Sequence, residues 1–210
     1  MNEHARTAGR RAYQKSKRAI DEQRTRGRIV DAAEALHGSL GPARTTVSGV
    51  ADAAGVTRAT VYRHFPDEES LFMACSSQWI ARQRLPNPGA WAVRDEPLAR
   101  LRIGLVDIYR YYRAGEPMLT QIHRDAEAVP PRVREARIHA QDQWAQVLLD
   151  PFPQRGSRVM QAAVAHAIAF DTWQSLCVGQ RLSDRSAVDL LVGMVTIARQ
   201  AVTGGRPSRA

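Results

Sequence analysis

The strongest constraint on the fold is a pair of short helical segments separated by a two-residue turn that begins with a glycine. Residues 47–54 and 57–64 each carry apolar side chains at helical spacing. Gly55 stands between them, where the chain can adopt a positive φ angle that other residues accept only at a cost. Two helices this short cannot bury their apolar faces alone, so they must pack on a neighbouring helix. This arrangement is the helix-turn-helix motif.

Helical periodicity also covers most of the chain outside this motif. Strand signals, which are alternating β-branched residues between turn dipeptides, are nearly absent. Breaks in the pattern fall at Gly41-Pro42, Phe65-Pro66 and Gly115–Pro117. We therefore predict an all-α protein, with helices over residues 29–40, 47–54, 57–64, 67–84, 98–112, 118–126, 133–149, 157–178 and 186–202.

The clearest linker is Leu85-Pro86-Asn87-Pro88-Gly89, and we place the domain boundary there. The predicted parts are a flexible basic arm (1–24), a helix-turn-helix domain whose fourth helix is a link (25–84), a second helical domain (85–203) and a frayed tail (204–210).

Basic charge is concentrated near the N-terminus. The chain carries a formal charge of +9, and residues 1–28 contain nine basic and three acidic residues, a net charge of +6. A basic arm of this kind can follow DNA phosphates or enter a minor groove. The alternative is a solvated leader without a specific role.

Several classes of protein are disfavoured. Cys75 and Cys177 match no metal-ligand spacing, and no Gly-rich phosphate loop, Gly-x-Ser-x-Gly elbow, His-Glu-x-x-His pair or Cys-x-x-Cys is present. The N-terminus lacks a secretory apolar core, and no apolar run approaches the roughly 18 residues of a membrane span. We expect a cytoplasmic protein that is not an enzyme, with no cofactor, metal or membrane partner.

The helix-turn-helix segment resembles a known family. The run from Thr45 to Phe65, TTVSGVADAAGVTRATVYRHF, is similar to the signature of the tetracycline-repressor (TetR) family. The upstream Arg28–Ala33 and the downstream Leu71-Phe72 also stand at matching distances. Members of this family are dimeric helical transcriptional regulators, so the resemblance implies double-stranded operator DNA as a partner.

The resemblance assigns DNA contacts to particular positions. It implies that Thr46 and Ser48 touch DNA and that Thr57 caps the recognition helix. It assigns base reading to Arg58, Ala59 and Thr60. It assigns phosphate anchoring to Tyr62 and His64, and Arg63 lies on the same helix and is also able to meet DNA. Two of these have alternatives, because Tyr62 is also suited to packing and His64 to ending a helix. One position departs from the family pattern: Glu68 stands where relatives have a phosphate-binding Lys.

The resemblance also implies that residues 85–203 enclose a small-molecule pocket and dimerise through the last two helices. Expected pocket residues are Tyr109, Tyr112, Met118, His123, Trp144, His166, Phe170, Trp173 and Cys177. Expected dimer contacts are Ala162, Ala163, Ala165, Ala167, Ala169, Leu191, Met194, Val195 and Ala198. In both sets the alternative is ordinary packing within one subunit's core.

The sequence therefore predicts a homodimeric repressor that a small-molecule ligand releases from a palindromic operator. The alternative function is a helix-turn-helix DNA-binding or interaction protein with no small-molecule effector. A second domain without a cavity of about 300 Å³ would favour that alternative.

Overall fold

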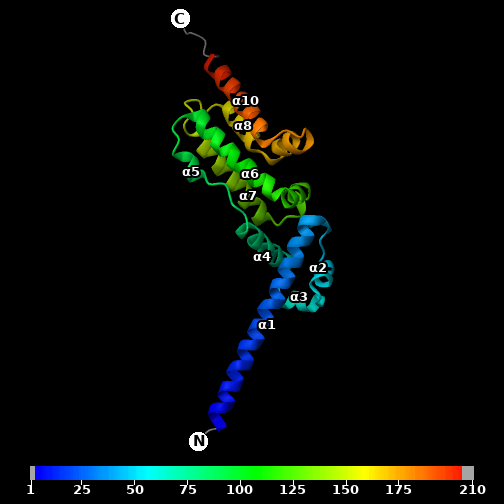
Figure 1. Ribbon diagram of the computed structural model, residues 1–210. Coiled ribbons are helices and arrows are strands. Elements are labelled where there is room, and N and C mark those ends of the chain that lie inside the picture. Colours follow the sequence, from blue (N-terminus) through cyan, green and yellow to red (C-terminus); the bar gives the residue numbers. More distant parts are fainter. Residues whose placement is uncertain (1–2, 205–210) are drawn as a thin grey trace. The chain divides into compact units, whose positions relative to one another are not determined.

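The computed structural model describes the backbone of residues 3–204 and the side chains of residues 14–204 (Figure 1). All regular structure in this range is helical, as predicted. The α-helices are α1 (Glu3–Ser39), α2 (Val47–Ala54), α3 (Arg58–His64), α4 (Glu68–Ala81), α5 (Pro88–Ala92), α6 (Pro97–Arg124), α7 (Pro131–Leu149), α8 (Arg158–Ile168), α9 (Phe170–Trp173) and α10 (Asp184–Gly204). Short turns of other helical types are η1 (Pro42–Arg44), η2 (Ala126–Ala128) and the π-helical η3 (Gln174–Gly179). Most of the predicted tail, residues 205–210, lies outside the described residues.

The chain divides into two units. The N-terminal unit contains the residues up to Arg82 together with 117–130, and the C-terminal unit contains 83–116 and the residues from Pro131 onward. This differs from the single boundary expected at residues 85–89. The second segment joins the N-terminal unit because Asp125 accepts a hydrogen bond from the backbone N–H of Ala43 (3.1 Å). The expected linker also contains the start of α5, where Asn87 accepts a hydrogen bond from Ala90 N–H (3.3 Å) and so caps the helix.

The core of the N-terminal unit forms where α1, α2, α3 and α4 present their apolar faces to one another. Ile29, Val50 and Val61 are each no more than 1% exposed, and one comes from each of the first three helices. Burial of a side chain of this size contributes about 1.5–3 kcal/mol. The helix-turn-helix is therefore held by α1, as its short helices require.

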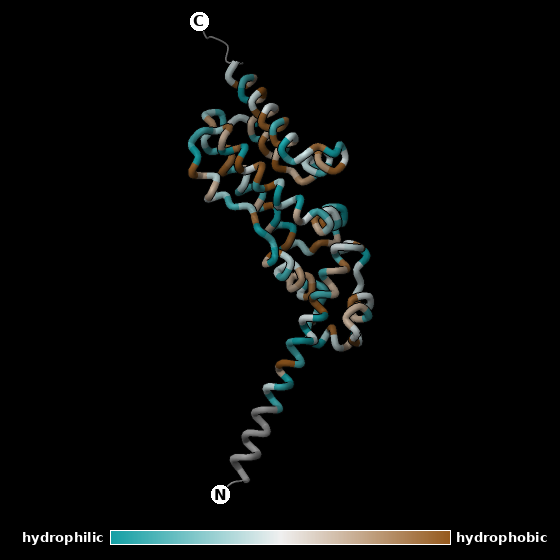
Figure 2. Tube along the Cα trace, viewed as in Figure 1, coloured by the Kyte–Doolittle hydropathy of each residue, from teal (hydrophilic) through white to brown (hydrophobic). Residues whose placement is uncertain are grey.

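Helix α1 is longer than predicted. The sequence suggested a flexible arm before residue 25, but α1 begins at Glu3 and continues to Ser39. Residues 14–28 consist mostly of Ala, Arg, Lys, Gln and Glu, which favour helix, and contain one glycine, Gly27. Their side chains are mainly exposed, so this part of α1 gains little from packing. Figure 2 shows that most residues in this stretch are hydrophilic. The basic side chains of residues 15–28 therefore lie along a helix and not on a flexible arm.

Helix α6 continues through a predicted break. Gly115–Pro117 was expected to end a helix, yet Pro117 lies inside α6. An internal proline removes one backbone hydrogen bond and costs about 3 kcal/mol. Beyond it, Leu119 and Ile122 are buried in the N-terminal unit. The burial of these two side chains offsets the cost of the internal proline. Pro117 is also the first residue of the second segment of the N-terminal unit.

One predicted helix, residues 157–178, is interrupted. Helix α8 ends at Ile168, Ala169 adopts an extended conformation (ψ 139°), and α9 begins at Phe170. The break leaves carbonyl groups without helical N–H partners. Tyr109 and Tyr112 of α6 supply donors in place of the missing N–H groups. Their hydroxyls donate hydrogen bonds to Ala167 O (2.9 Å) and Ile168 O (2.7 Å). These side-chain donors come from a distant segment, so local sequence does not reveal the break.

The rest of the C-terminal unit packs closely around α6. Gly104 lies directly against the Leu148 side chain of α7, where a larger residue would collide. The buried Arg100 donates to the carbonyls of Arg94 (2.6 Å) and Val147 (3.2 Å). This guanidinium therefore ties the segment after α5 and the end of α7 to α6.

Candidate nucleic-acid interface

Two threonine caps and one glycine set the geometry of the helix-turn-helix. The Thr46 hydroxyl accepts a hydrogen bond from Gly49 N–H (3.1 Å) at the start of α2. Gly55 ends α2 with φ 64°, in the left-handed region expected for it. The Thr57 hydroxyl then accepts from Thr60 N–H (3.2 Å) at the start of α3. These local interactions fix the angle between the helices without help from DNA.

Helix α3 separates a buried face from an exposed one. Val61 is 1% exposed and holds the helix on the core, whereas Arg58, Ala59 and Arg63 are exposed. Thr60 is half-buried, and its hydroxyl lies 3.0 Å from that of Thr57. The first turn of α3 thus presents a guanidinium beside two methyl groups. Such a surface suits guanine and the thymine methyl group in a major groove.

The two residues with alternative interpretations differ in exposure. Tyr62 is 41% exposed, so its ring is available at the surface as a phosphate contact requires. His64 is half-buried, and its Nε2 atom is covered without a hydrogen-bond partner among the described residues. A phosphate contact through that nitrogen requires the ring to move. The exposure of Tyr62 therefore argues against its packing alternative, whereas the covered ring of His64 fits its alternative role of ending the helix.

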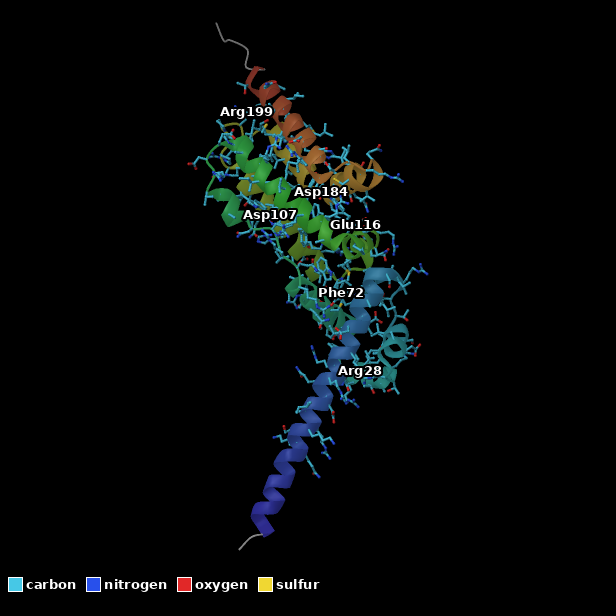
Figure 3. All side chains as sticks on the ribbon, viewed as in Figure 1. Arg28, Phe72, Asp107, Glu116, Asp184 and Arg199 are labelled. Carbon is cyan, nitrogen blue, oxygen red and sulfur yellow. The ribbon has the colours of Figure 1, made fainter. Side chains whose placement is uncertain are left out.

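The start of α2 and the length of α1 extend the exposed polar surface. Thr46 and Ser48 are both exposed. Arg28 lies on α1 near the α2–α3 corner (Figure 3), with its Nη1 3.9 Å from where a Cβ on Gly55 would stand. Arg26 stacks its guanidinium 4.7 Å from the centre of the Phe65 ring, which closes α3. Basic side chains of α1 are therefore fixed near α3.

Glu68 is exposed in the first turn of α4. The helix begins with a capping box, in which Asp67 accepts from Ser70 N–H (2.7 Å) and Ser70 Oγ accepts from Asp67 N–H (3.4 Å). Acidic residues at this end stabilise a helix but repel a phosphate. The structure supplies a reason for Glu68 in helix stability, while leaving this position unfavourable for DNA contact.

In the C-terminal unit, four expected pocket residues pack against one another. Tyr109, Tyr112, Phe170 and Trp173 are each no more than 2% exposed. Phe170 meets Tyr112 edge to face at 5.2 Å between ring centres and Trp173 at 5.4 Å. Burial raises the pKa of both tyrosines, so their hydroxyls remain neutral donors. This cluster forms part of the core.

The other expected pocket residues are dispersed. Met118 and His123 belong to the N-terminal unit. Trp144 is half-buried with its ring 6.2 Å from that of Tyr111, and His166 is exposed with Nδ1 3.3 Å from the Thr172 hydroxyl. Burial raises the pKa of the Cys177 thiol to about 12. Among the described side chains, no three His, Cys, Asp or Glu residues group as a metal site requires.

Helices α8 and α10 pack together. Among the expected dimer contacts, Ala167, Leu191 and Val195 are buried within their own subunit, as the alternative interpretation stated. Ala162 and Ala165 are exposed, and Ala163, Ala169, Met194 and Ala198 are half-buried.

Comparison with known sequences finds similarity within the N-terminal unit. Residues 29–75 match the family described as "Bacterial regulatory proteins, tetR family". The HTH-type transcriptional regulator TtgR of Pseudomonas putida is 43% identical over 54 residues, which are 26% of this chain and 26% of TtgR. The HTH-type transcriptional regulator AcrR of Shigella flexneri is 42% identical over 52 residues, 25% of this chain and 24% of AcrR. The chain therefore matches about a quarter of the length of these curated relatives.

Comparison with solved structures extends the fold beyond that match. A TetR-like transcriptional regulator from Rhodococcus sp. RHA1 superposes with a TM-score of 0.59 at 18% identity, over 87% of this chain and 97% of that one. NalD of Pseudomonas aeruginosa is the secondary repressor of the MexAB-OprM multidrug efflux pump. It superposes with a TM-score of 0.51 at 21% identity, over 85% of this chain and 96% of NalD. The match to the tetR family model thus lies within the N-terminal unit, and over most of the chain these two solved regulators have the same fold.

Proposed function

We propose that this protein is a sequence-specific, DNA-binding transcriptional repressor and not an enzyme. The observation that carries the proposal is the first turn of α3, where Arg58 and Ala59 are exposed on a helix held by the buried Val61. A guanidinium in this position can donate two hydrogen bonds to guanine, a contact that contributes about 1–3 kcal/mol of discrimination between bases. The other proposed contacts are Thr46, Ser48, Thr57, Thr60, Tyr62, Arg63 and His64.

We propose a homodimer as the DNA-binding species. One helix-turn-helix makes few base contacts, and a symmetric pair reading two half-sites doubles them. Leu190 (53% exposed) and Ile197 (68%) lie seven residues apart on α10, with the open Gly193 between them. On α8, Val159 is 53% exposed. Val159, Ala162 and Ala163 on α8, and Leu190, Met194 and Ile197 on α10, recur at helical spacing within each helix, and we call these six residues the apolar strip.

By length and composition alone, α10 would be long and apolar enough to cross a bilayer. A second copy of the chain is the simpler cover for its outward apolar face, because α10 already packs on α8. Paired α8 and α10 helices from two subunits would form a four-helix bundle. In this assignment the residues of the apolar strip make the dimer contacts. Ala167, Leu191 and Val195, which the sequence suggested for that role, are buried within their own subunit.

The proposed regulation is release of a palindromic operator by a small molecule. A ligand achieves this only through different affinities for the DNA-competent and released states. TtgR and AcrR are regulators, and NalD is a repressor. The aromatic cluster around Tyr112 and Trp173 fills the interior position where the sequence suggested a pocket, so an effector has to bind elsewhere in the protein.

Selection of bound duplexes from a random library tests the central proposal. Purified full-length protein is incubated with the library at a stated salt concentration, because phosphate contacts make affinity depend on salt. We expect a palindromic motif with two half-sites. Uniform, salt-sensitive binding without any motif would contradict the proposal, since it would show that basic charge alone drives association.

A further inference from the structure

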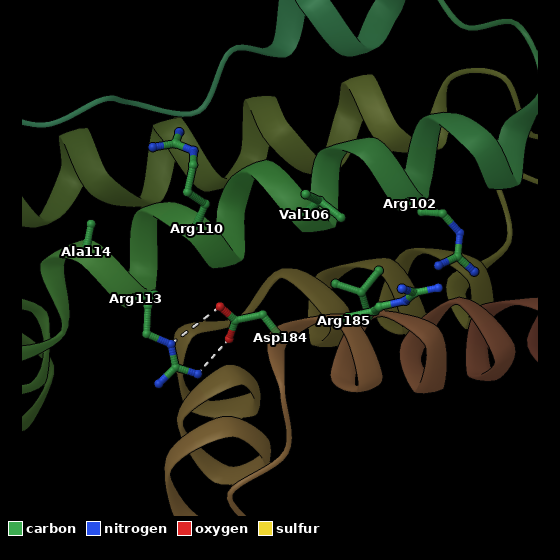
Figure 4. Close-up of a pocket in the computed structure, with 8 residues that line it drawn as sticks. Arg102, Val106, Arg110, Arg113, Ala114, Asp184 and Arg185 are labelled. Atoms are coloured by element: carbon green, nitrogen blue, oxygen red, sulfur yellow. Dashed lines mark hydrogen bonds and ion pairs between the residues drawn. The ribbon is translucent and has the colours of Figure 1, made fainter.

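The C-terminal unit contains a groove that the sequence predictions did not anticipate. It lies between α6 and α10 and has a volume of about 730 Å³ (Figure 4). This volume falls within the roughly 300–1,000 Å³ of small-molecule sites. Six of its lining residues matter here: Arg102, Val106 and Arg113 from α6, and Asp184, Arg185 and Val188 from α10.

The cationic side chains of the groove differ in how firmly they are paired. Arg113 donates to Asp184 (2.7 Å) and stacks its guanidinium 4.9 Å from the Trp173 ring centre, so it is fixed in place. Arg102 pairs with Asp189, but both side chains are about half exposed, and such pairs contribute only about 0–1 kcal/mol. Arg185 is exposed and forms no ion pair among the described residues.

The wall between these charges is apolar. Val106 is 54% exposed on the α6 side, and Val188 is buried on the α10 side. Figure 4 shows Val106 on α6 between the Arg113–Asp184 pair and the Arg102 and Arg185 guanidinium groups. An exposed valine beside weakly paired arginines suits a ligand with an apolar body and one anionic end.

We propose that this groove binds a small amphipathic carboxylate. The carboxylate accepts hydrogen bonds from Arg102 and Arg185, and the apolar body covers the exposed Val106. Charge-assisted hydrogen bonds of this kind are about twice as strong as neutral ones. Binding of the carboxylate exchanges the Asp189 partner of Arg102 for the ligand.

A ligand in this position would touch both α6 and α10. Asp184, the first residue of α10, also accepts a hydrogen bond from Trp173 Nε1 (3.2 Å). The same helix carries the proposed dimer strip around Leu190 and Ile197, so the groove and the strip share one rigid element. That the bound carboxylate acts as the effector rests on the proposed repressor function, whereas binding itself does not.

Calorimetric titration of the full-length protein without DNA tests the site. The probes are straight-chain carboxylates from butanoate to dodecanoate, with decanol and decylamine as neutral and cationic counterparts. We expect saturable binding of at least one carboxylate, and affinities at least about tenfold weaker for the alcohol and the amine, as loss of one charge-assisted interaction predicts. Absence of saturable binding across the carboxylates would overturn the proposal.

Variants locate the binding. The double variant Arg102→Gln, Arg185→Gln should weaken carboxylate binding at least about tenfold. Arg132→Gln, an exposed arginine on α7, is the matched control and should bind like the unmodified protein. Equal affinity of all three proteins would overturn the site, and circular dichroism of each variant establishes that it is folded.

The duplex selection distinguishes this inference from the proposed function. If carboxylates bind in the groove but no DNA motif is recovered, the site stands and the repressor proposal fails. If a motif is recovered but no carboxylate binds, the repressor proposal stands and this site fails.

Discussion

A buried histidine makes the stability of the N-terminal unit depend on pH. His37 of α1 is 7% exposed, its ring centre lies 4.7 Å from that of Phe72, and its Nδ1 lies 3.3 Å from the Cys75 sulfur. Burial disfavours the charged imidazolium and lowers the pKa of His37 from 6.5 to about 4. The folded unit therefore holds this histidine neutral.

The sign of the effect follows from the two pKa values. Unfolded His37 binds a proton near pH 6.5, whereas the folded form does so only near pH 4, so acid favours unfolding. The stabilisation is fully present above about pH 6.5 and is lost as the pH falls toward 4. With these values the loss is about 2 kcal/mol at pH 5 and approaches about 3 kcal/mol at lower pH.

Urea unfolding at pH 7.5 and pH 5.0 measures this loss, with hydrogen exchange of α1 and α4 amides assigning the transition to the N-terminal unit. His37→Gln should be less stable at pH 7.5 but should lose about 2 kcal/mol less than the unmodified protein between the two pH values. His139→Gln, at an exposed position on α7, is the matched control. Equal pH dependence of the unmodified protein and His37→Gln would refute the reasoning.

Three further variants test packing, assembly and the α1 charge. Gly104→Ala should lower the free energy of unfolding by about 1–3 kcal/mol in urea titrations, because its methyl group collides with Leu148; an unchanged value would contradict the packing described. Gly193→Ala should stabilise α10 by about 1 kcal/mol through helix propensity. It should also weaken self-association in sedimentation equilibrium, because its methyl group would stand in the open space between Leu190 and Ile197 of the proposed interface. Unchanged or stronger association would place the interface elsewhere. Lys17→Gln with Arg24→Gln should flatten the salt dependence of binding to any DNA, with the slope of log affinity against log salt changing by about 2 if both contact phosphates. An unchanged slope would show that this part of α1 makes no phosphate contact.

Local chemistry explains why the helix-turn-helix was predictable. Thr57, Gly55 and the apolar spacing around Val61 act within a few residues of one another, so their roles can be inferred from sequence. The all-α fold was confirmed for the same reason, because helical periodicity repeats along the chain. The DNA contacts themselves remain predictions that rest on exposure and resemblance.

Features that depend on distant segments were not predictable. The break after Ile168 is stabilised by hydroxyl groups of Tyr109 and Tyr112, about sixty residues earlier in the chain. The same contacts place both tyrosines in the core, where the sequence suggested a pocket. Arg102 and Val106 recur at helical spacing, and this was a signal in the sequence for one side of the groove. The other side carries Arg185, which lies on another helix and is distant in sequence, so the groove itself was not predictable.

The central claim, that α3 reads DNA sequence, is tested most directly by the specificity ratio of defined variants. Affinities for the selected duplex and for a scrambled duplex are compared at one salt concentration for the unmodified protein, Arg58→Ala and Glu69→Gln, an exposed control on α4. We predict that Arg58→Ala lowers the ratio at least about tenfold, from a loss of about 1–3 kcal/mol in base contacts per half-site, while the control retains it. An unchanged ratio for Arg58→Ala would contradict recognition through this residue of α3.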